Sequence, residues 1–152
     1  YVKLPFGAGY TFTKGITIQA WIKTSDSSDG GIVVSRGSSY HALMLGSGIQ
    51  IPYFALSGTT SYGIGGPNPV NDGNWHHLVG TYDNSQICLY VDGVKYTTPN
   101  TGVVITTGNF EIARDNCCGL GDIRMIEGVI DEVRIYDWAL TETEVLYLYN
   151  NP

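Results

Sequence analysis

Short segments in which apolar and polar residues alternate follow one another along most of the chain. Residues 15–25 show the pattern best, because a strand directs successive side chains to opposite faces. One face then holds Ile16, Ile18, Ala20 and Ile22, and the other holds Thr17, Gln19, Trp21 and Lys23. Similar segments span residues 1–5, 31–36, 40–46, 49–58, 74–83, 86–98, 110–115 and 129–136, and residues 63–74 form a long loop rich in Gly and Pro. Short strands with turns about every 8–12 residues predict an antiparallel two-sheet sandwich.

Two local motifs sharpen this prediction. Asp92-Gly93 lies between two strand-like segments, which is the pattern of a two-residue type I′ hairpin. Near the end of the chain, Thr141 is followed three residues later by Glu144, and this spacing is typical of a capping box. We therefore predict one helix, from about residue 142 to residue 149.

Length and composition favour one all-β domain spanning residues 1–152. The chain has 20 Gly, 11 Tyr, 3 Trp and 4 Phe, and only 14% of its residues are charged. Its formal net charge of −6 argues against a nucleic acid or an anionic membrane as partner. No apolar run approaches the roughly 20 residues that cross a bilayer, so we expect no membrane insertion. The chain opens directly on a strand-like segment, and we expect it to be excised from a larger protein.

The three cysteines do not form a metal-binding pattern. Cys88, Cys117 and Cys118 contain no Cys-x-x-Cys pair, which disfavours a thiolate zinc site. In an oxidising compartment a disulfide can join Cys88 to one of the adjacent pair and leave one thiol. We predict this disulfide, although the sequence does not supply the distances that it requires.

Three segments, in order, resemble the laminin-G-like jelly-roll domains of the concanavalin A-like lectin/glucanase superfamily: GITIQAWIKT, GNWHHLVGTYDNSQICLYVDGVKY and GVIDEVRIYDWALTETEVLYLY. They span roughly residues 15–150. The resemblance implies a curved two-sheet jelly roll that is mostly non-catalytic and extracellular. Such domains bind glycans or proteins as parts of secreted enzymes, adhesins and surface proteins, and many hold calcium. The adjacent cysteines depart from the family pattern, so nothing is carried over to the segment that contains them.

Candidate catalytic groups are poorly placed. Retaining glycosidases need two carboxylates about 5–5.5 Å apart. Alternation puts Asp131 and Glu132 on opposite faces of their strand. It also separates His76 from His77, so the two cannot chelate one ion, and we expect His76 to be a hydrogen-bonded core histidine. We predict that the chain is not an enzyme, with glycoside hydrolysis a distant third possibility.

The Asp131 carboxylate needs a compensating partner if residues 129–136 alternate strictly. It then shares a face with Val133 and Ile135, and an ionised group beside an apolar face is costly. Backbone amides, an arginine such as Arg124, and a cation are all open as partners.

A structural calcium site is implied by the resemblance. In the similar glucanase sandwiches, an Asp at this strand start binds calcium beside backbone oxygens, and calcium accepts carboxylate and carbonyl ligands in a loose shell. We predict a structural calcium site at Asp131, with Asp29 and Gly30 as further ligands. The hydrogen-bonded alternative for Asp131 stays open.

Sugar recognition requires an exposed aromatic plane beside polar side chains. The residues of this kind at strand ends or loops are Tyr62, Trp75, Tyr40, Arg114, Asp115 and Asn116. We expect Trp138 to be buried beneath the helix. The leading function is a carbohydrate-binding, lectin-like module of a secreted or surface protein, with a polysaccharide or glycoprotein glycan as partner. The alternative is a structural or adhesive domain that binds another protein or another copy of itself.

Overall fold

The chain folds into two layers of β-strands and one helix. A computed structural model describes residues 2–4, 12, 14–27, 31–36, 41–45, 50–57, 61–100, 109–113 and 126–152. The elements are β1 Val2–Leu4, β2 Ile16–Lys23, β3 Gly31–Arg36, β4 His41–Leu45, β5 Pro52–Ser57, β6 Ser61–Gly65, β7 Trp75–Tyr82, β8 Gln86–Val91, β9 Val94–Pro99, β10 Phe110–Ile112, β11 Val129–Tyr136 and α1 Glu142–Asn150.

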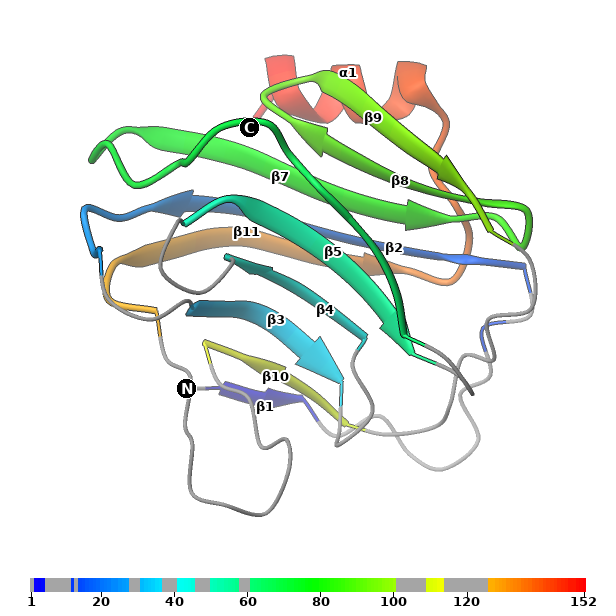
Figure 1. Ribbon diagram of the computed structural model, residues 1–152, viewed down its shortest axis with the longest axis horizontal. Helices are drawn as coiled ribbons and strands as arrows, with labels where there is room; N and C mark the ends of the chain where they lie inside the picture. Colours follow the sequence, from blue (N-terminus) through cyan, green and yellow to red (C-terminus); the bar gives the residue numbers. More distant parts are fainter. Residues whose placement is uncertain are drawn as a thin grey trace.

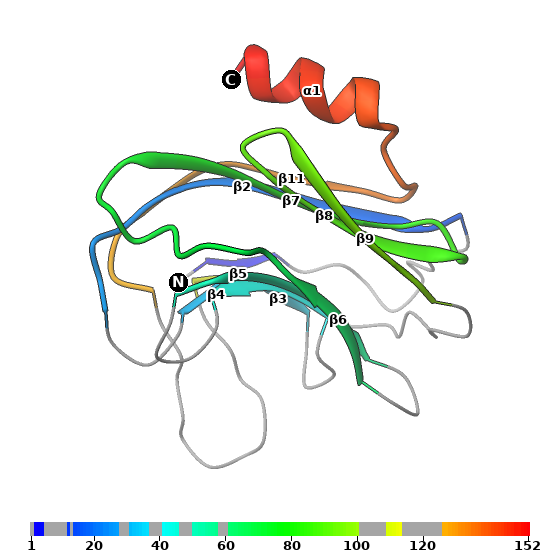
Figure 2. The same ribbon diagram turned by 45° about the horizontal axis from the view of Figure 1, so that its top comes forward.

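Within these described residues the strands form two antiparallel sheets. One sheet has six strands in the order β1-β10-β3-β4-β5-β6, and the other has five in the order β11-β2-β7-β8-β9. Figures 1 and 2 show two curved layers, with α1 lying across the outer side of the five-stranded layer. The predicted all-β sandwich with one short C-terminal helix is confirmed.

The hydrophobic core lies between the two sheets. The four apolar residues of β2 that alternation placed on one face are all completely buried there. They pack in one cluster with residues of the six-stranded sheet that include Val33, Val34, Leu43, Phe54, Leu56 and Phe110. Complete burial of an aliphatic side chain contributes about 1.5–3 kcal/mol, so this face stabilises the fold. We call it the core face of the five-stranded sheet.

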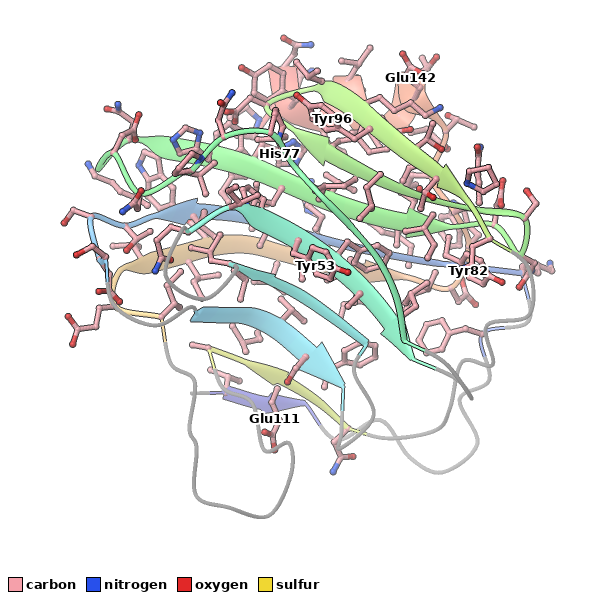
Figure 3. All side chains as sticks on the ribbon, viewed as in Figure 1. Tyr53, His77, Tyr82, Tyr96, Glu111 and Glu142 are labelled. Atoms are coloured by element: carbon pink, nitrogen blue, oxygen red, sulfur yellow. The ribbon has the colours of Figure 1, made fainter. Side chains whose placement is uncertain are left out.

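The opposite face of the five-stranded sheet, which we call the helix-side face, is also shielded. Thr17 and Gln19 are completely buried on it. The Thr17 hydroxyl donates to the backbone oxygen of Trp138 at 2.8 Å and accepts from the Leu140 amide at 2.9 Å. These two bonds fix the segment that leads into α1 against β2. Figure 3 shows His77 on the same side of the sheet as the helix.

A β-bulge interrupts β11 and corrects the predicted orientation of Asp131. The register with β2 shifts between Asp131 and Arg134, and Glu132 has a positive φ of 50°. Because the bulge adds one residue, Ile130 and Val133 both pack against the core although they are three positions apart. Asp131 therefore stays on the helix-side face, where it is exposed. The prediction that Asp131 shares a face with Val133 is wrong.

The segment predicted as a long loop begins with a strand. β6 pairs with β5 and places Gly63 opposite Ala55. A side chain at Gly63 would collide with the ring of Tyr53, so glycine is what allows that ring to lie across β6. Glycine, which normally signals a turn, here permits a close approach within a sheet.

The two local motifs are confirmed, and one expectation about the C-terminal segment is wrong. Asp92 and Gly93 have φ values of 51° and 80°, as a type I′ turn requires. Thr141 caps α1, and Glu144 completes the capping box. Trp138 is not buried beneath the helix, because 44% of its surface is exposed.

Candidate functional site

Three neighbouring strands bring the candidate site together on the helix-side face. Asp131 of β11 lies opposite Trp21 of β2, and Trp21 lies opposite His77 of β7. Trp75 is two residues before His77 and therefore shares its face. An aromatic and acidic surface thus runs across β11, β2 and the beginning of β7.

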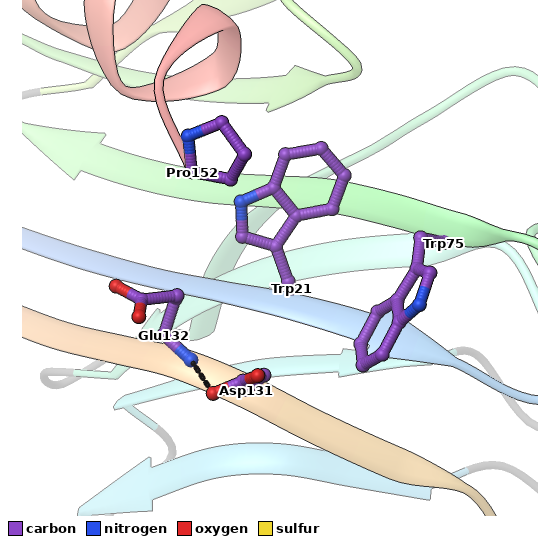
Figure 4. Close-up of a pocket in the computed structure, with 5 residues that line it drawn as sticks. All are labelled: Trp21, Trp75, Asp131, Glu132 and Pro152. Atoms are coloured by element: carbon purple, nitrogen blue, oxygen red, sulfur yellow. Dashed lines mark hydrogen bonds between the residues drawn. The ribbon is translucent and has the colours of Figure 1, made fainter.

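An open pocket of about 390 Å³ occupies this surface. Its lining residues are Trp21, Trp75, Asp131, Glu132 and Pro152. Figure 4 shows the two indoles on one side and the two acidic residues on the other, with Pro152 beyond Trp21. The indole of Trp75 is 42% exposed, whereas Trp21 is half-buried. The pocket therefore combines an accessible aromatic plane with carboxylate groups.

The acidic side of the pocket depends on the bulge in β11. Asp131 Oδ1 accepts a hydrogen bond from the Glu132 amide at 2.8 Å. Glu132 forms an ion pair with Arg134, through Oε2 and Nη2. Asp131 and Glu132 were expected on opposite faces, but both line this pocket. That expectation is wrong, because the bulge removes the regular alternation on which it rested.

Trp21, which lines the pocket, belongs to a group of three aromatic rings between the sheet and α1. The ring centroids of Trp21 and His77 are 5.0 Å apart, and each lies 5.9 Å from the ring of Tyr149. His77 is completely buried, and neither of its ring nitrogens has a hydrogen-bond partner in the described part of the chain. Burial lowers the pKa of His77 to about 4, so this ring is neutral at physiological pH.

At the rim, a network of hydrogen bonds holds the turn that carries Trp75. His76 lies between two carboxylates, with Nδ1 2.7 Å from Asp92 Oδ2 and Nε2 3.0 Å from Asp72 Oδ1. Burial disfavours the charged ring, but the bonds to Asp92 and Asp72 outweigh it and raise the pKa of His76 above its ordinary value. Hydrogen bonds from the backbone and side chain of Asn74, followed by the bond to His76, lower the pKa of Asp72 to about 2.

This network holds the backbone on both sides of Trp75. Asp92 also accepts from the His77 amide, with its Oδ1 at 2.8 Å, so one carboxylate contacts both histidines. His76 has its hydrogen bonds satisfied as expected, but it is only half-buried, and the buried histidine is His77. The expectation for His76 is therefore right about its partners and wrong about its place in the core.

The predicted binding residues fall into three groups. Trp75 lies in the pocket. Tyr62 belongs to β6 in the other sheet, where it is paired with Leu56, and its side chain is not described. Four predictions lie outside the described residues, namely Tyr40, Arg114, Asp115 and Asn116.

Sequence reasoning missed three lining residues of the pocket. Trp21 was visible as an aromatic residue opposite the isoleucines of β2, but packing was the more common explanation for such a residue. Glu132 was expected on the solvent side of its strand, which is correct, but nothing in the alternation indicated that Asp131 would lie beside it. Pro152 carried no signal in the sequence.

The described residues supply only some of the oxygen ligands that a calcium ion requires. Asp131 is exposed and offers one oxygen that is not bonded to a backbone amide, while Asp29 and Gly30 lie outside the described residues. No group of three or more His, Cys, Asp or Glu side chains suited to a metal occurs in the part of the chain that the structure describes. The calcium site at Asp131, Asp29 and Gly30 stays a prediction.

The cysteine pairing is also untested. Cys88 is a buried thiol on the helix-side face, where it packs with Val79, Tyr90 and Val145. Cys117 and Cys118 lie outside the described residues. No helix in the described chain is long and apolar enough to cross a membrane.

Two curved antiparallel sheets with an open aromatic pocket on one outer face define a lectin-like jelly-roll sandwich. The chain belongs to the concanavalin A-like lectin/glucanases superfamily, whose match covers residues 1–146. The resemblance noted in the sequence is thereby confirmed. No curated protein matches the chain by sequence.

Solved structures share this fold at low sequence identity. A proposed carbohydrate-binding protein from Bacteroides ovatus has a TM-score of 0.76 and 21% identity, over 93% of this chain and 42% of that one. A botulinum neurotoxin type C structure, reported with cell entry that depends on two ganglioside molecules, has a TM-score of 0.68 and 13% identity, over 92% and 36%. Domain 4 of the extracellular arabinanase AbnA from Geobacillus stearothermophilus, in complex with arabinotriose, has a TM-score of 0.63 and 22% identity, over 90% and 66%. This chain spans less than half of the first two proteins, and identities this low establish the shared fold alone.

Proposed function

We propose that the chain is a non-catalytic module that binds an oligosaccharide in the pocket beside Trp75, within a larger secreted or surface protein. The observation that carries the proposal is the accessible indole of Trp75, which lies in one pocket with Asp131 and Glu132. An aromatic plane covers the apolar face of a sugar ring, and carboxylates accept hydrogen bonds from its hydroxyl groups.

The rigidity of the rim supports the same function. The hydrogen bonds of His76 to Asp72 and Asp92 hold the backbone on either side of Trp75. A backbone that is already held loses little conformational freedom when a ligand stacks on the indole, which favours affinity. Trp21 supports the pocket from behind through its stack with His77 and Tyr149.

The structural neighbours are consistent with a glycan as ligand. Their descriptions mention carbohydrate binding, ganglioside interaction and a complex with arabinotriose. The arabinanase is extracellular, which agrees with the secreted location proposed here. The proposal itself rests on the pocket, because the shared fold alone does not transfer a ligand.

The test is a glycan array followed by calorimetric titration of the strongest ligand. We expect Trp75→Ala to weaken binding at least about tenfold, which is about 1.4 kcal/mol. Trp138→Ala is the matched control, because Trp138 is equally exposed, at 44%, but lies outside this pocket. Tyr62→Ala tests the six-stranded sheet as the binding surface instead. Equal affinity of Trp75→Ala and the unmodified chain would refute the proposed pocket.

The same samples distinguish the alternatives. Sedimentation that shows concentration-dependent assembly, together with an array that shows no glycan binding, would favour the structural or adhesive domain. Release of new reducing ends from a bound oligosaccharide would instead indicate glycoside hydrolysis by the pocket that contains Asp131 and Glu132.

A further inference from the structure

The charged groups that line the pocket are carboxylates, and the two indoles add only neutral N–H donors. Asp131 and Glu132 contribute carboxylates, and neither Lys nor Arg is among the described lining residues. Ionised carboxylates accept hydrogen bonds but donate none. The pocket therefore suits ligand groups that donate, such as hydroxyl and ammonium groups.

Each carboxylate retains capacity for a ligand. Asp131 Oδ1 is bonded to the Glu132 amide, and Glu132 Oε2 is paired with Arg134. The second oxygen of each group makes no hydrogen bond within the described part of the chain. Because Asp131 is exposed and Glu132 is half-buried, both remain within reach of a ligand in the pocket.

Among the described residues, two cations lie near the pocket without lining it. Arg134 is paired with Glu132, so the charges of these two residues compensate each other and Asp131 is the carboxylate without a cationic partner in the described chain. Lys23 lies in the next row of the sheet, opposite Trp75 and Val129, and its side chain is exposed to water. A ligand carboxylate inside the pocket would thus face the uncompensated charge of Asp131, with no cation among the described lining residues.

We infer that the pocket selects uncharged oligosaccharides and rejects sugars that carry a carboxylate or a sulfate. This inference rests on the proposed function and names the class of its ligand. Two like charges about 4 Å apart weaken binding about fivefold in bulk water, and several hundredfold at the effective dielectric constant near a protein surface. An ammonium group in place of a hydroxyl group should bind at least as well, since it donates to the same oxygens.

The experiment compares pairs of sugars that differ in charge. In galacturonate oligomers a carboxylate replaces the hydroxymethyl group of galactose oligomers, and sialyllactose adds an acidic residue to lactose. In each of these pairs that binds, we expect the uncharged member to be favoured over the acidic member by at least about tenfold at low salt. Oligomers of glucosamine should bind at least as well as oligomers of N-acetylglucosamine. Added salt should narrow the difference, because screening weakens exposed charges.

Variants that replace a carboxylate by an amide of the same shape test whether the preference for uncharged sugars arises in the pocket. In the double variant Asp131→Asn and Glu132→Gln, we expect the acidic sugar to gain at least fivefold in affinity relative to its uncharged counterpart. Glu142→Gln is the matched control, because it removes one negative charge from the start of α1, outside the pocket, and should leave the preference unchanged.

The outcomes separate the two proposals. Glycan binding that depends on Trp75 but shows equal or higher affinity for acidic sugars would overturn the charge selection and leave the proposed function standing. A preference that survives in the double variant would also overturn it, since its origin would lie elsewhere. An absence of binding to every probe would overturn both.

Discussion

The two faces of the five-stranded sheet are equally well shielded in the first half of β2 but differ in chemistry. On the core face, Ile16, Ile18 and Ile22 are completely buried among other apolar side chains. On the helix-side face, Thr17 and Gln19 are just as deeply buried, although they are polar. β2 thus separates the hydrophobic core from a layer of buried polar residues beneath α1. We call the second group, which includes Thr17, Gln19 and His77, the polar layer.

The polar layer is the less stable of the two arrangements. Gln19 Oε1 and both ring nitrogens of His77 have no hydrogen-bond partner among the described residues. A buried polar atom without a partner costs about 1–3 kcal/mol. The proposed binding pocket lies over this layer, at Trp21 and Trp75. The core face accordingly supplies stability, and the helix-side face keeps the groups that can bind a ligand.

The largest effect should come from a cavity in the core face. We expect Ile18→Ala to lower the free energy of unfolding by about 2–5 kcal/mol, because the surrounding strands cannot fill the cavity that the smaller side chain leaves. Gln19→Leu is the comparison on the next residue. It replaces a poorly satisfied amide by an apolar group of similar size and should change stability by less than about 1 kcal/mol. Denaturant titration measures both, and similar losses for the two variants would contradict the contrast between the faces.

Calcium tests whether the helix-side face also holds a metal. If Asp131 binds calcium with Asp29 and Gly30 as predicted, a hundredfold excess over Kd should stabilise the chain by about 2.7 kcal/mol. Chelation should then lower Tm, and Asp131→Asn should remove the response. An identical Tm for the metal-free and the calcium-loaded chain would show that Asp131 serves only as the acceptor for the Glu132 amide.

A fall in pH should reduce the contribution of the helix-side face to stability before it reduces that of the core face. Because burial lowers the pKa of His77 to about 4, the unfolded chain takes up this proton first. Stability is then complete above about pH 6.5 and falls as the pH drops towards 4, by a loss on the order of 3 kcal/mol. His77→Phe keeps a ring between Trp21 and Tyr149. In this variant the free energy of unfolding, measured at several pH values, should change much less between pH 6.5 and 4. An unchanged slope would contradict the assignment to His77.

The neighbouring histidine should act in the opposite direction. The pKa of His76 is raised, so its contribution to stability is present below about pH 6.5 and is lost as the pH rises through the folded-state pKa. His76→Asn should remove the loss of stability that accompanies a rise in pH above about 6.5. The loss of stability between pH 6.5 and 4, which we assign to His77, should remain. Two adjacent residues thus report separately on the solvated rim and the buried layer.

The core face could be predicted from the sequence because it follows regular rules. Alternation in β2 identified the isoleucines that are buried, and the turn at Asp92-Gly93 is specified by two residues that accept positive φ. Alternation also divided β2 into its two faces correctly. It could not reveal that α1 covers the second face, because a helix that packs on a sheet is a long-range contact.

The candidate site was harder to predict because it depends on an irregularity. A single extra residue at the bulge keeps Asp131 exposed and brings Glu132 into the pocket, and a slip of one residue exchanges the faces of a strand. The pocket also joins residues from β2, β7, β11 and the segment after α1, which no local motif connects. Trp75 was found because exposed aromatic residues beside a loop are a general feature of sugar sites.

The smallest effect on stability should come from loss of the N-terminal cap of α1. The substitution tests whether α1 shields the polar layer from water. Thr141 accepts a hydrogen bond from the Glu144 amide, and Glu144 accepts from the Thr141 amide at 2.7 Å. Thr141→Ala removes the first of these bonds and should lower the free energy of unfolding by about 0.5–2 kcal/mol. Val145 remains buried against the sheet, so the helix should loosen rather than detach.

Loosening of α1 should affect the two faces unequally. Tyr149 of the helix stacks on His77, so more water should reach the ring and raise its pKa back towards 6.5. The loss of stability between pH 6.5 and 4 should therefore be smaller in Thr141→Ala than in the unmodified chain. Hydrogen exchange should increase at the helix amides while the amides of β2 stay protected. An unchanged unfolding midpoint would mean that the cap contributes nothing, and faster exchange in β2 would mean that the helix supports the core face as well.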